Sequence, residues 1–144
     1  MSLLETLSQE HREVSRLIDG VLASSDPAER RRLFEEAASK LIAHAEAEDR
    51  VLYKPLLQKG GDARQLMLFA EEEHVLLEGI VRGLRRRENT ESDSWMHMCN
   101  ILSSALAHHV SQEENEAFPE ARRHFAASEL DRMDQEFRAE MGRY

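Results

Sequence analysis

The sequence contains few of the residues that crosslink a chain or break its helices. Its 144 residues include one Cys, three Pro and six Gly. One cysteine excludes a disulfide framework within the chain and any cysteine-rich zinc module. Few Pro and Gly, with abundant Glu, Leu, Ala and Arg, are typical of an all-α domain. With 41% hydrophobic residues the chain can bury one ordinary core, so we expect a single domain over residues 1–144.

Positive charge and long apolar runs are also scarce. The formal net charge of −9 argues against nucleic acid or an anionic membrane as the main partner. No apolar run approaches the roughly 20 residues that cross a bilayer. The N-terminal segment MSLLETLSQEH has neither a basic region nor a sustained apolar region, so it predicts no secretion signal. We therefore expect a soluble cytoplasmic protein that binds neither nucleic acid nor membrane.

Apolar residues spaced three or four apart predict four long amphipathic helices. Asp26-Pro27 is a typical helix start, and Gly60-Gly61 is a typical break between helices. A shorter last helix is predicted over about residues 128–141, with Ser128 as its cap. Four long helices with short connections favour an up-down-up-down four-helix bundle carrying a short C-terminal extra helix.

Six polar residues occupy positions on the apolar stripes, where the core of the bundle is expected. They are His11, His44, Glu48, His74, His109 and Glu113. Each histidine lies near the middle of its own predicted helix, so the six side chains should meet at one level of the bundle. A buried charge without a partner is costly, so these groups need one another or a metal.

The two halves of the sequence repeat this arrangement. LSQEHREVSRLIDGVL around His11 aligns with FAEEEHVLLEGIVRGL around His74, and the segment around His44 aligns with that around His109. Each half is therefore a helical hairpin with one lone His followed by His-x-x-x-Glu. A single His-x-x-x-Glu is a weak signal, because such pairs are common on solvated helices. Two in register favour a metal site over ordinary core histidines.

Imidazoles and carboxylates without thiolates suit iron, manganese or zinc. Six side chains are too many for one structural zinc ion, which takes four ligands. We therefore expect a pair of ions with two histidines each, bridged by Glu48 and Glu113. With one solvent bridge, each ion would have about five donors and about one open position. O₂, NO or peroxide would bind at such a position.

The order His, His-x-x-x-Glu, His, His-x-x-x-Glu, with Tyr53-Lys54-Pro55 and Phe118-Pro119 after the motifs, resembles the hemerythrin-like HHE cation-binding domains. The resemblance covers about residues 4–120. It implies a four-helix bundle holding a non-haem di-iron centre, with two iron ions (Fe²⁺/Fe³⁺) and a bridging oxygen species. It implies that the ligands are His11, His44, Glu48, His74, His109 and Glu113.

The motif departs from that of the oxygen-carrying members of this family. Ala70 stands where they have a histidine four residues before His74, and Glu113 replaces a later Asp. The site is then more open, unless Glu71 fills the gap. The pattern looks more like that of relatives that sense iron or oxygen or repair iron–sulfur clusters. A ferritin-like di-iron oxidase is excluded, because only Glu71-x-x-His74 fits its Glu-x-x-His pattern.

Three functions therefore stay open at this point. The chain binds or senses O₂, NO or iron; or it is a di-iron enzyme acting on peroxide or supporting iron–sulfur repair; or it is a zinc-bound or metal-free scaffold. The first is the preferred hypothesis. A homodimer or an unidentified protein partner is compatible with each of them.

The remaining notable residues have simpler interpretations. His108 lies next to His109 on the helix and is a candidate for hydrogen bonding to the site or for replacing a ligand. His97 and His124 are predicted at the surface or at an end of the bundle, and Cys99 in the core. The last helix is compatible with packing on the bundle or on a second subunit.

Overall fold

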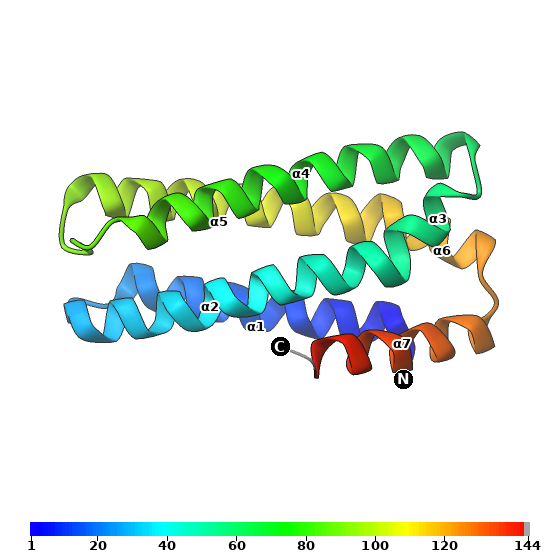
Figure 1. Ribbon diagram of the computed structural model, residues 1–144, viewed down its shortest axis with the longest axis horizontal. Coiled ribbons are helices and arrows are strands. Elements are labelled where there is room, and N and C mark those ends of the chain that lie inside the picture. The colour runs from blue at the N-terminus through cyan, green and yellow to red at the C-terminus, as the bar shows by residue number, and fades with distance from the viewer. Residues whose placement is uncertain (143–144) are drawn as a thin grey trace.

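Four long helices lie side by side in the computed structural model, which describes residues 1–142 (Figure 1). They are α1 (Leu3–Ala23), α2 (Pro27–Glu48), α4 (Gly61–Arg86) and α5 (Asp93–Gln112). Helix α1 packs against α2 and α5, and α4 packs against the same two helices, so the four enclose one core. Successive long helices run in opposite directions in the figure. Residues 1–142 contain no strand, and the predicted all-α class is confirmed.

Local chemistry sets the ends of these helices. The Asp26 carboxylate accepts a hydrogen bond from the Ala28 backbone N–H at 3.2 Å, which caps α2 as predicted. Ser92 caps α5 in the same way, accepting from the Trp95 N–H at 3.1 Å. Gly60 and Gly61 have φ angles of 75° and 57°, a region that favours glycine, and they turn the chain into α4.

Two wider, π-helical turns end the second and fourth helices: one begins directly after Glu48 and the other begins at Glu113. Segment η1 (Asp49–Tyr53) leads into α3 (Lys54–Leu57), and η2 (Glu113–Ala117) leads into α6 (Phe118–His124). Pro55 and Pro119 lie in the first turn after each of these segments. Proline lacks a backbone N–H and crowds the preceding turn, so a regular α-helix cannot continue there. The α-helix therefore restarts at Phe118 after the widened turn Glu113–Ala117, and such turns are often found at functional sites.

The last helix, α7 (Ala127–Met141), packs on α1, α2 and η1 of its own chain. Its N-cap is Ala126, two residues before the expected Ser128 cap. The Glu129 carboxylate instead accepts from the Ala126 backbone N–H at 3.0 Å. Phe137 is 1% exposed, and its ring meets the His44 ring edge-on at 5.6 Å. Helix α7 therefore covers one side of the predicted site, a role that the sequence left undecided.

The core consists of two apolar clusters separated by a polar layer. One cluster includes Leu7 of α1 and Met67 of α4, and the other includes Val14 and Leu77 of the same two helices. His11 and His74 lie between these pairs along the chain, so the polar layer has apolar packing on both sides. No helix within residues 1–142 combines the length and the apolar character needed to cross a membrane.

Candidate metal centre

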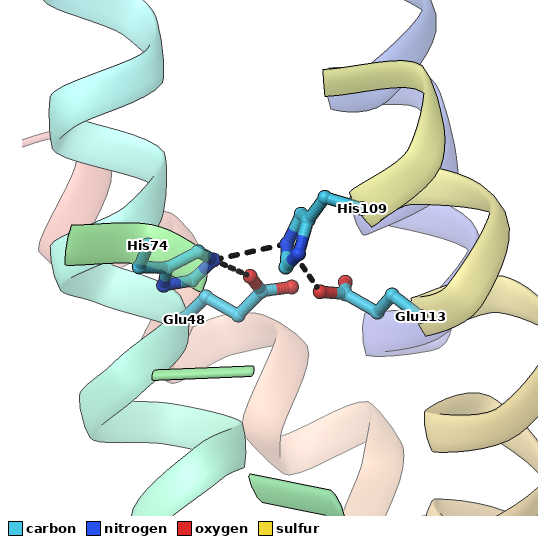
Figure 2. Close-up of side chains that lie close together, drawn as sticks. All are labelled: Glu48, His74, His109 and Glu113. Atoms are coloured by element: carbon cyan, nitrogen blue, oxygen red, sulfur yellow. Dashed lines mark hydrogen bonds and ion pairs between the residues drawn. The ribbon is translucent and has the colours of Figure 1, made fainter. Parts of the chain in front are cut away.

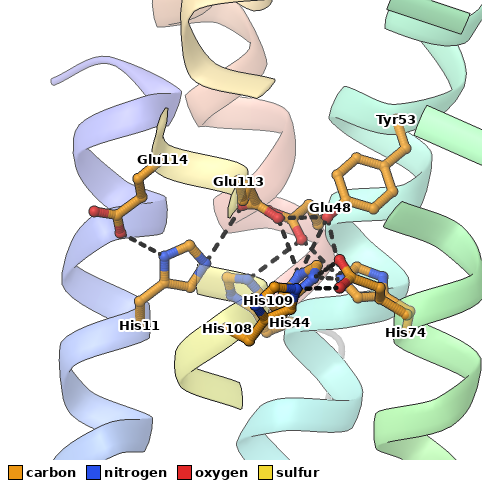
Figure 3. A network of polar contacts seen from close by, with 10 residues as sticks. His11, His44, Glu48, Tyr53, His74, His108, His109, Glu113 and Glu114 are labelled. Carbon is orange, nitrogen blue, oxygen red and sulfur yellow. Dashed lines mark hydrogen bonds and ion pairs between the residues drawn. The ribbon is translucent and has the colours of Figure 1, made fainter. Parts of the chain in front are cut away.

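The structure brings all six predicted side chains to this polar layer (Figures 2 and 3). Five of them are buried, and the side chain of His74 is 12% exposed. Two groups of nitrogen and oxygen atoms lie close enough together to hold a metal ion. One consists of Glu48, His74, His109 and Glu113, and the other of His11, His44 and Glu48.

Each helical hairpin supplies one pair of imidazoles. The His11 and His44 rings, from α1 and α2, have centroids 5.1 Å apart. The His74 and His109 rings, from α4 and α5, have centroids 4.8 Å apart. The arrangement therefore has two halves, one for each repeat of the sequence, as the internal alignment predicted.

The two carboxylates lie between these imidazole pairs. The Glu113 oxygens are 3.4 Å from His11 Nε2 and 3.2 Å from His109 Nε2. Glu48 Oε1 is 3.6 Å from His44 Nε2 and 3.1 Å from His74 Nε2. Each carboxylate thus reaches one histidine from each hairpin. This placement fits carboxylates that bridge two ions.

Several atoms of the polar layer lack a hydrogen bond within the described part of the chain, and bound cations would compensate them. Within residues 1–142, His11 Nε2, Glu113 Oε1 and both oxygens of Glu48 are buried without a hydrogen bond. Such groups are costly unless something compensates them. His74 Nε2 and His109 Nε2 are 3.1 Å apart. Two nitrogen ligands at about 2.1 Å from one ion, set roughly at a right angle, would be about 3.0 Å apart.

Two further glutamates orient the imidazoles from outside. His11 Nδ1 is 2.8 Å from Glu114 Oε2, and His109 Nδ1 is 2.9 Å from Glu73 Oε1. A proton held on Nδ1 by a carboxylate leaves the Nε2 lone pair free to bind a metal. Sequence reasoning did not assign these residues. The available signal was their position next to a predicted ligand, Glu114 after Glu113 and Glu73 before His74.

The sequence had instead raised Glu71 as a candidate to fill the open position. Burial and the neighbouring Asp49 carboxylate raise the pKa of Glu71. Both residues line a surface hollow between α2 and α4, and no atom of Glu71 belongs to either group that could hold a metal within residues 1–142. Among the three consecutive glutamates, Glu73 makes the contact with a predicted ligand.

Removing the Glu73 carboxylate should weaken metal binding without abolishing it. We expect Glu73→Ala to lower metal affinity by roughly 10- to 100-fold, the range typical of groups that orient a metal-binding histidine. Competition with a chromophoric chelator measures this change. Glu36→Ala, at a side chain that is 59% exposed on α2, is the matched control. Equal affinities in the two variants would show that Glu73 does not orient His109.

Tyr53 is a second residue that sequence reasoning did not place in the site. It is fully buried, and its hydroxyl donates a hydrogen bond to Glu113 Oε2. The Tyr53 hydroxyl oxygen is also 3.3 Å from His74 Nε2 and 3.4 Å from His109 Nε2 (Figure 3). The repeat aligns Tyr53 with Phe118, whose ring lies beside His11 instead. The two halves therefore differ, because only the His74–His109 half has a hydroxyl group at this position.

Electrostatics in the polar layer favour imidazolium–carboxylate pairs when no metal is bound. Burial lowers the pKa of His11 and of His109, but the surrounding carboxylates, Glu113 and Glu48 among them, together outweigh this effect and raise each pKa to about 9. Burial alone would raise the pKa of Glu48, whereas His44 and its neighbours hold it well below its usual value. Burial and Glu113 raise the pKa of Tyr53 well above its usual value, so the phenol keeps its proton. A metal ion would replace the protons on the two imidazoles.

The other histidines and the cysteine lie away from the centre. The side chain of His108 is 69% exposed, and its Nε2 is 3.8 Å from Glu73 Oε2. His97 is exposed, and His124 pairs with Glu120 at 3.2 Å. Cys99 is buried in an apolar cluster, and burial raises the pKa of its thiol to about 12.

Comparison with known proteins agrees with this geometry. No solved structure matches the chain. A DNA nickase of Nostoc sp. (strain PCC 7120 / SAG 25.82 / UTEX 2576) is 26% identical over 141 residues. The match covers 96% of this chain and 39% of the relative, so the chain spans well under half of that protein. Residues 2–121 match the model of the hemerythrin HHE cation binding domain. The chain therefore belongs to the hemerythrin family of HHE cation-binding domains.

Proposed function

We propose that the protein is a cytoplasmic non-haem di-iron protein that binds or senses O₂, NO or iron in an up-down-up-down four-helix bundle. The ions would be held by His11, His44, Glu48, His74, His109 and Glu113. The observation that carries the proposal is the convergence of four imidazoles and two carboxylates between two apolar clusters. We propose iron because binding O₂ needs a redox-active ion, and imidazoles with carboxylates suit iron.

The surroundings of the histidines support a small apolar ligand. A cavity of about 20 Å³ is lined by all four histidines together with Leu41, Leu77 and Leu106. A volume of this order holds about one water-sized molecule. Bound iron would supply an open position at which O₂ or NO binds reversibly. The leucines would exclude bulk water, which favours a diatomic ligand over a charged or larger one.

Three other side chains would hold protons around the centre. Glu73 and Glu114 hold protons on the outer nitrogens of His109 and His11, so that each Nε2 faces the ions. Tyr53 holds a proton at its hydroxyl oxygen, beside Glu113 and the His74–His109 half. A donor at that point can stabilise negative charge that develops on a bound oxygen species.

The position of the Tyr53 hydroxyl also favours the second candidate function, an enzyme that acts on peroxide. Breaking the O–O bond of peroxide requires protons, and the Tyr53 hydroxyl is a buried proton donor next to the predicted ions. A supporting role in iron–sulfur repair would use the same ligands. A zinc-bound or metal-free scaffold is the third possibility. The similarity to a DNA nickase supplies no further candidate function, because the match covers only 39% of that protein.

Metal analysis combined with rapid mixing tests the proposal. We expect about two iron ions per chain after anaerobic reconstitution, the number that two donor groups would hold. Stopped-flow mixing of the reduced protein with O₂ or NO should give a visible absorption band that disappears when the gas is removed. The zinc-loaded protein, which cannot change redox state, is the control.

Each alternative has its own result in the same experiment. Many turnovers of peroxide by each chain, without a stable band, would favour the enzyme. Less than about one iron per chain, with zinc retained, would favour the scaffold and contradict a di-iron function.

A further inference from the structure

The outer side of α4 and α5 is unusually apolar for a surface. On α4, Phe69, Val75 and Leu76 are 51%, 62% and 69% exposed, and on α5 Ile101 is 52% exposed. Within residues 1–142, every large hydrophobic side chain that is exposed, apart from Met1, lies on these two helices. An exposed helix of a monomeric domain normally presents polar side chains to water. We call the surface formed by Phe69, Leu76 and Ile101 the outer face; Val75 lies beside the hollow between α2 and α4.

The outer face follows a regular helical spacing on α4. Exposed or partly exposed positions three and four residues apart run along the side of α4 opposite its buried stripe. They are Phe69, Glu72, Leu76, Gly79, Gly83 and Arg86. The buried stripe, which includes Met67, Leu77 and Leu84, already packs inside the bundle. A second stripe with the spacing of a helix–helix contact predicts a second helical partner.

The glycines of this stripe have no explanation from packing within residues 1–142. A Cβ atom added at Gly79 or at Gly83 would meet no atom within 4 Å. Glycine inside a helix is less favourable than alanine, so space alone does not require it here. Glycine would be required at both positions if a helix from another molecule approached α4 closely there.

The face continues from α4 onto α5. His108 Nε2 lies 3.8 Å from Glu73 Oε2, which places His108 at the seam between the two helices. Ile101 is two helical turns before His108 and so lies on the same side of α5. Leu76 is three residues after Glu73 and lies beside this seam on α4. The apolar surface therefore spans two helices, not one isolated side chain.

Charge indicates which partner fits. Glu73 faces His109 of α5, and Arg85 pairs with Glu35 of α2. The charged residues on the outer stripe are therefore Glu72 in the N-terminal part of α4 and Arg86 at its C-terminal end. A helix with this polarity complements a copy of itself that runs antiparallel to it. In a parallel pair, like charges would face each other. A two-fold axis near Gly79 would place Glu72 opposite Arg86 of the second copy, with Leu76 next to its Gly83.

We propose that the outer face is the interface of a symmetric homodimer, in which α4 of one copy packs antiparallel on α4 of the other. Such an interface is isologous, because the same residues serve on both sides. Leu76 supplies its apolar contact, the glycines allow the helices to approach, and the opposite charges of Glu72 and Arg86 set the direction.

Sedimentation velocity of the full chain over a concentration series tests this proposal. We expect wild-type protein to sediment as a dimer, and Leu76→Lys to raise the dimer dissociation constant by at least about 100-fold, because it places a like charge at the centre of the interface. Leu76 is 69% exposed, so the variant should fold, which circular dichroism checks. Gln135→Lys, at an exposed position on α7, adds the same charge elsewhere and should stay dimeric.

A charge exchange tests the antiparallel direction. Glu72→Arg alone should weaken the dimer, and adding Arg86→Glu should restore it to near the wild-type dissociation constant. A wild-type protein that stays monomeric up to about 100 μM, or a dimer unaffected by Leu76→Lys, would overturn the proposal. A dimer that is weakened by Leu76→Lys but not restored by the double exchange would overturn the antiparallel arrangement.

Discussion

Glu113→Ala protein is expected to bind at most one metal ion per chain and to lose most of the thermal stability that metal confers. The Glu113 oxygens lie between His11 and His109, one from each hairpin, so no other side chain of the six replaces their joint contact. Metal bound to a folded site stabilises the fold directly. We expect the melting temperature of the metal-loaded protein to fall by more than about 10 °C.

A second variant and a control separate this effect from general damage. His44→Ala should also abolish two-metal binding, since His44 belongs to the other half of the centre. Glu116→Ala removes an exposed carboxylate one turn away and should keep the wild-type metal content. Elemental analysis and calorimetry, with and without metal, give both quantities. Wild-type metal content in the Glu113 and His44 variants would exclude the ligand assignment.

The stability of the metal-free protein should fall as pH rises from about 6.5 to about 9. In the folded protein His11 and His109 have pKa values raised from 6.5 to about 9, because the combined effect of Glu113 and the other nearby carboxylates exceeds that of burial. A pKa that is higher in the folded than in the unfolded state stabilises the folded protein. This stabilisation is complete at pH values below the unfolded-state pKa and is lost as the pH rises through the folded-state pKa. The loss should be on the order of 3 kcal/mol for each imidazole.

Metal binding should show the opposite dependence on pH. A metal ion needs the neutral imidazole, so binding at pH 7 should release about two protons, one each from His11 and His109. Titration calorimetry in buffers of different ionisation enthalpy measures this release, and acidification should drive the metal off. His97→Ala, at an exposed histidine, should release the same number of protons. Binding without proton release, or full retention of metal down to about pH 4, would contradict coordination by these imidazoles.

The sequence alone determined the helices and the six side chains that meet. Helical periodicity is local, so His44 and Glu48 on one stripe must share a face of one helix, whatever that helix packs against. The internal repeat then implied that His109 and Glu113 share a second face facing the first. Helix starts at Asp26 and after Gly60 follow from capping and from backbone freedom, which are also local properties.

Only the tertiary structure decided which neighbours support that set. The choice of Glu73 over Glu71 depends on which carboxylate faces His109 across the gap between α4 and α5. Tyr53 reaches Glu113 because the π-helical turn before Pro55 redirects its side chain inward, and sequence spacing does not encode that rotation. Helix α7 covers His44 through Phe137, a contact between residues far apart in the chain. Such contacts depend on how helices are rotated and stacked, whereas the ligand stripes depend only on the period of a single helix.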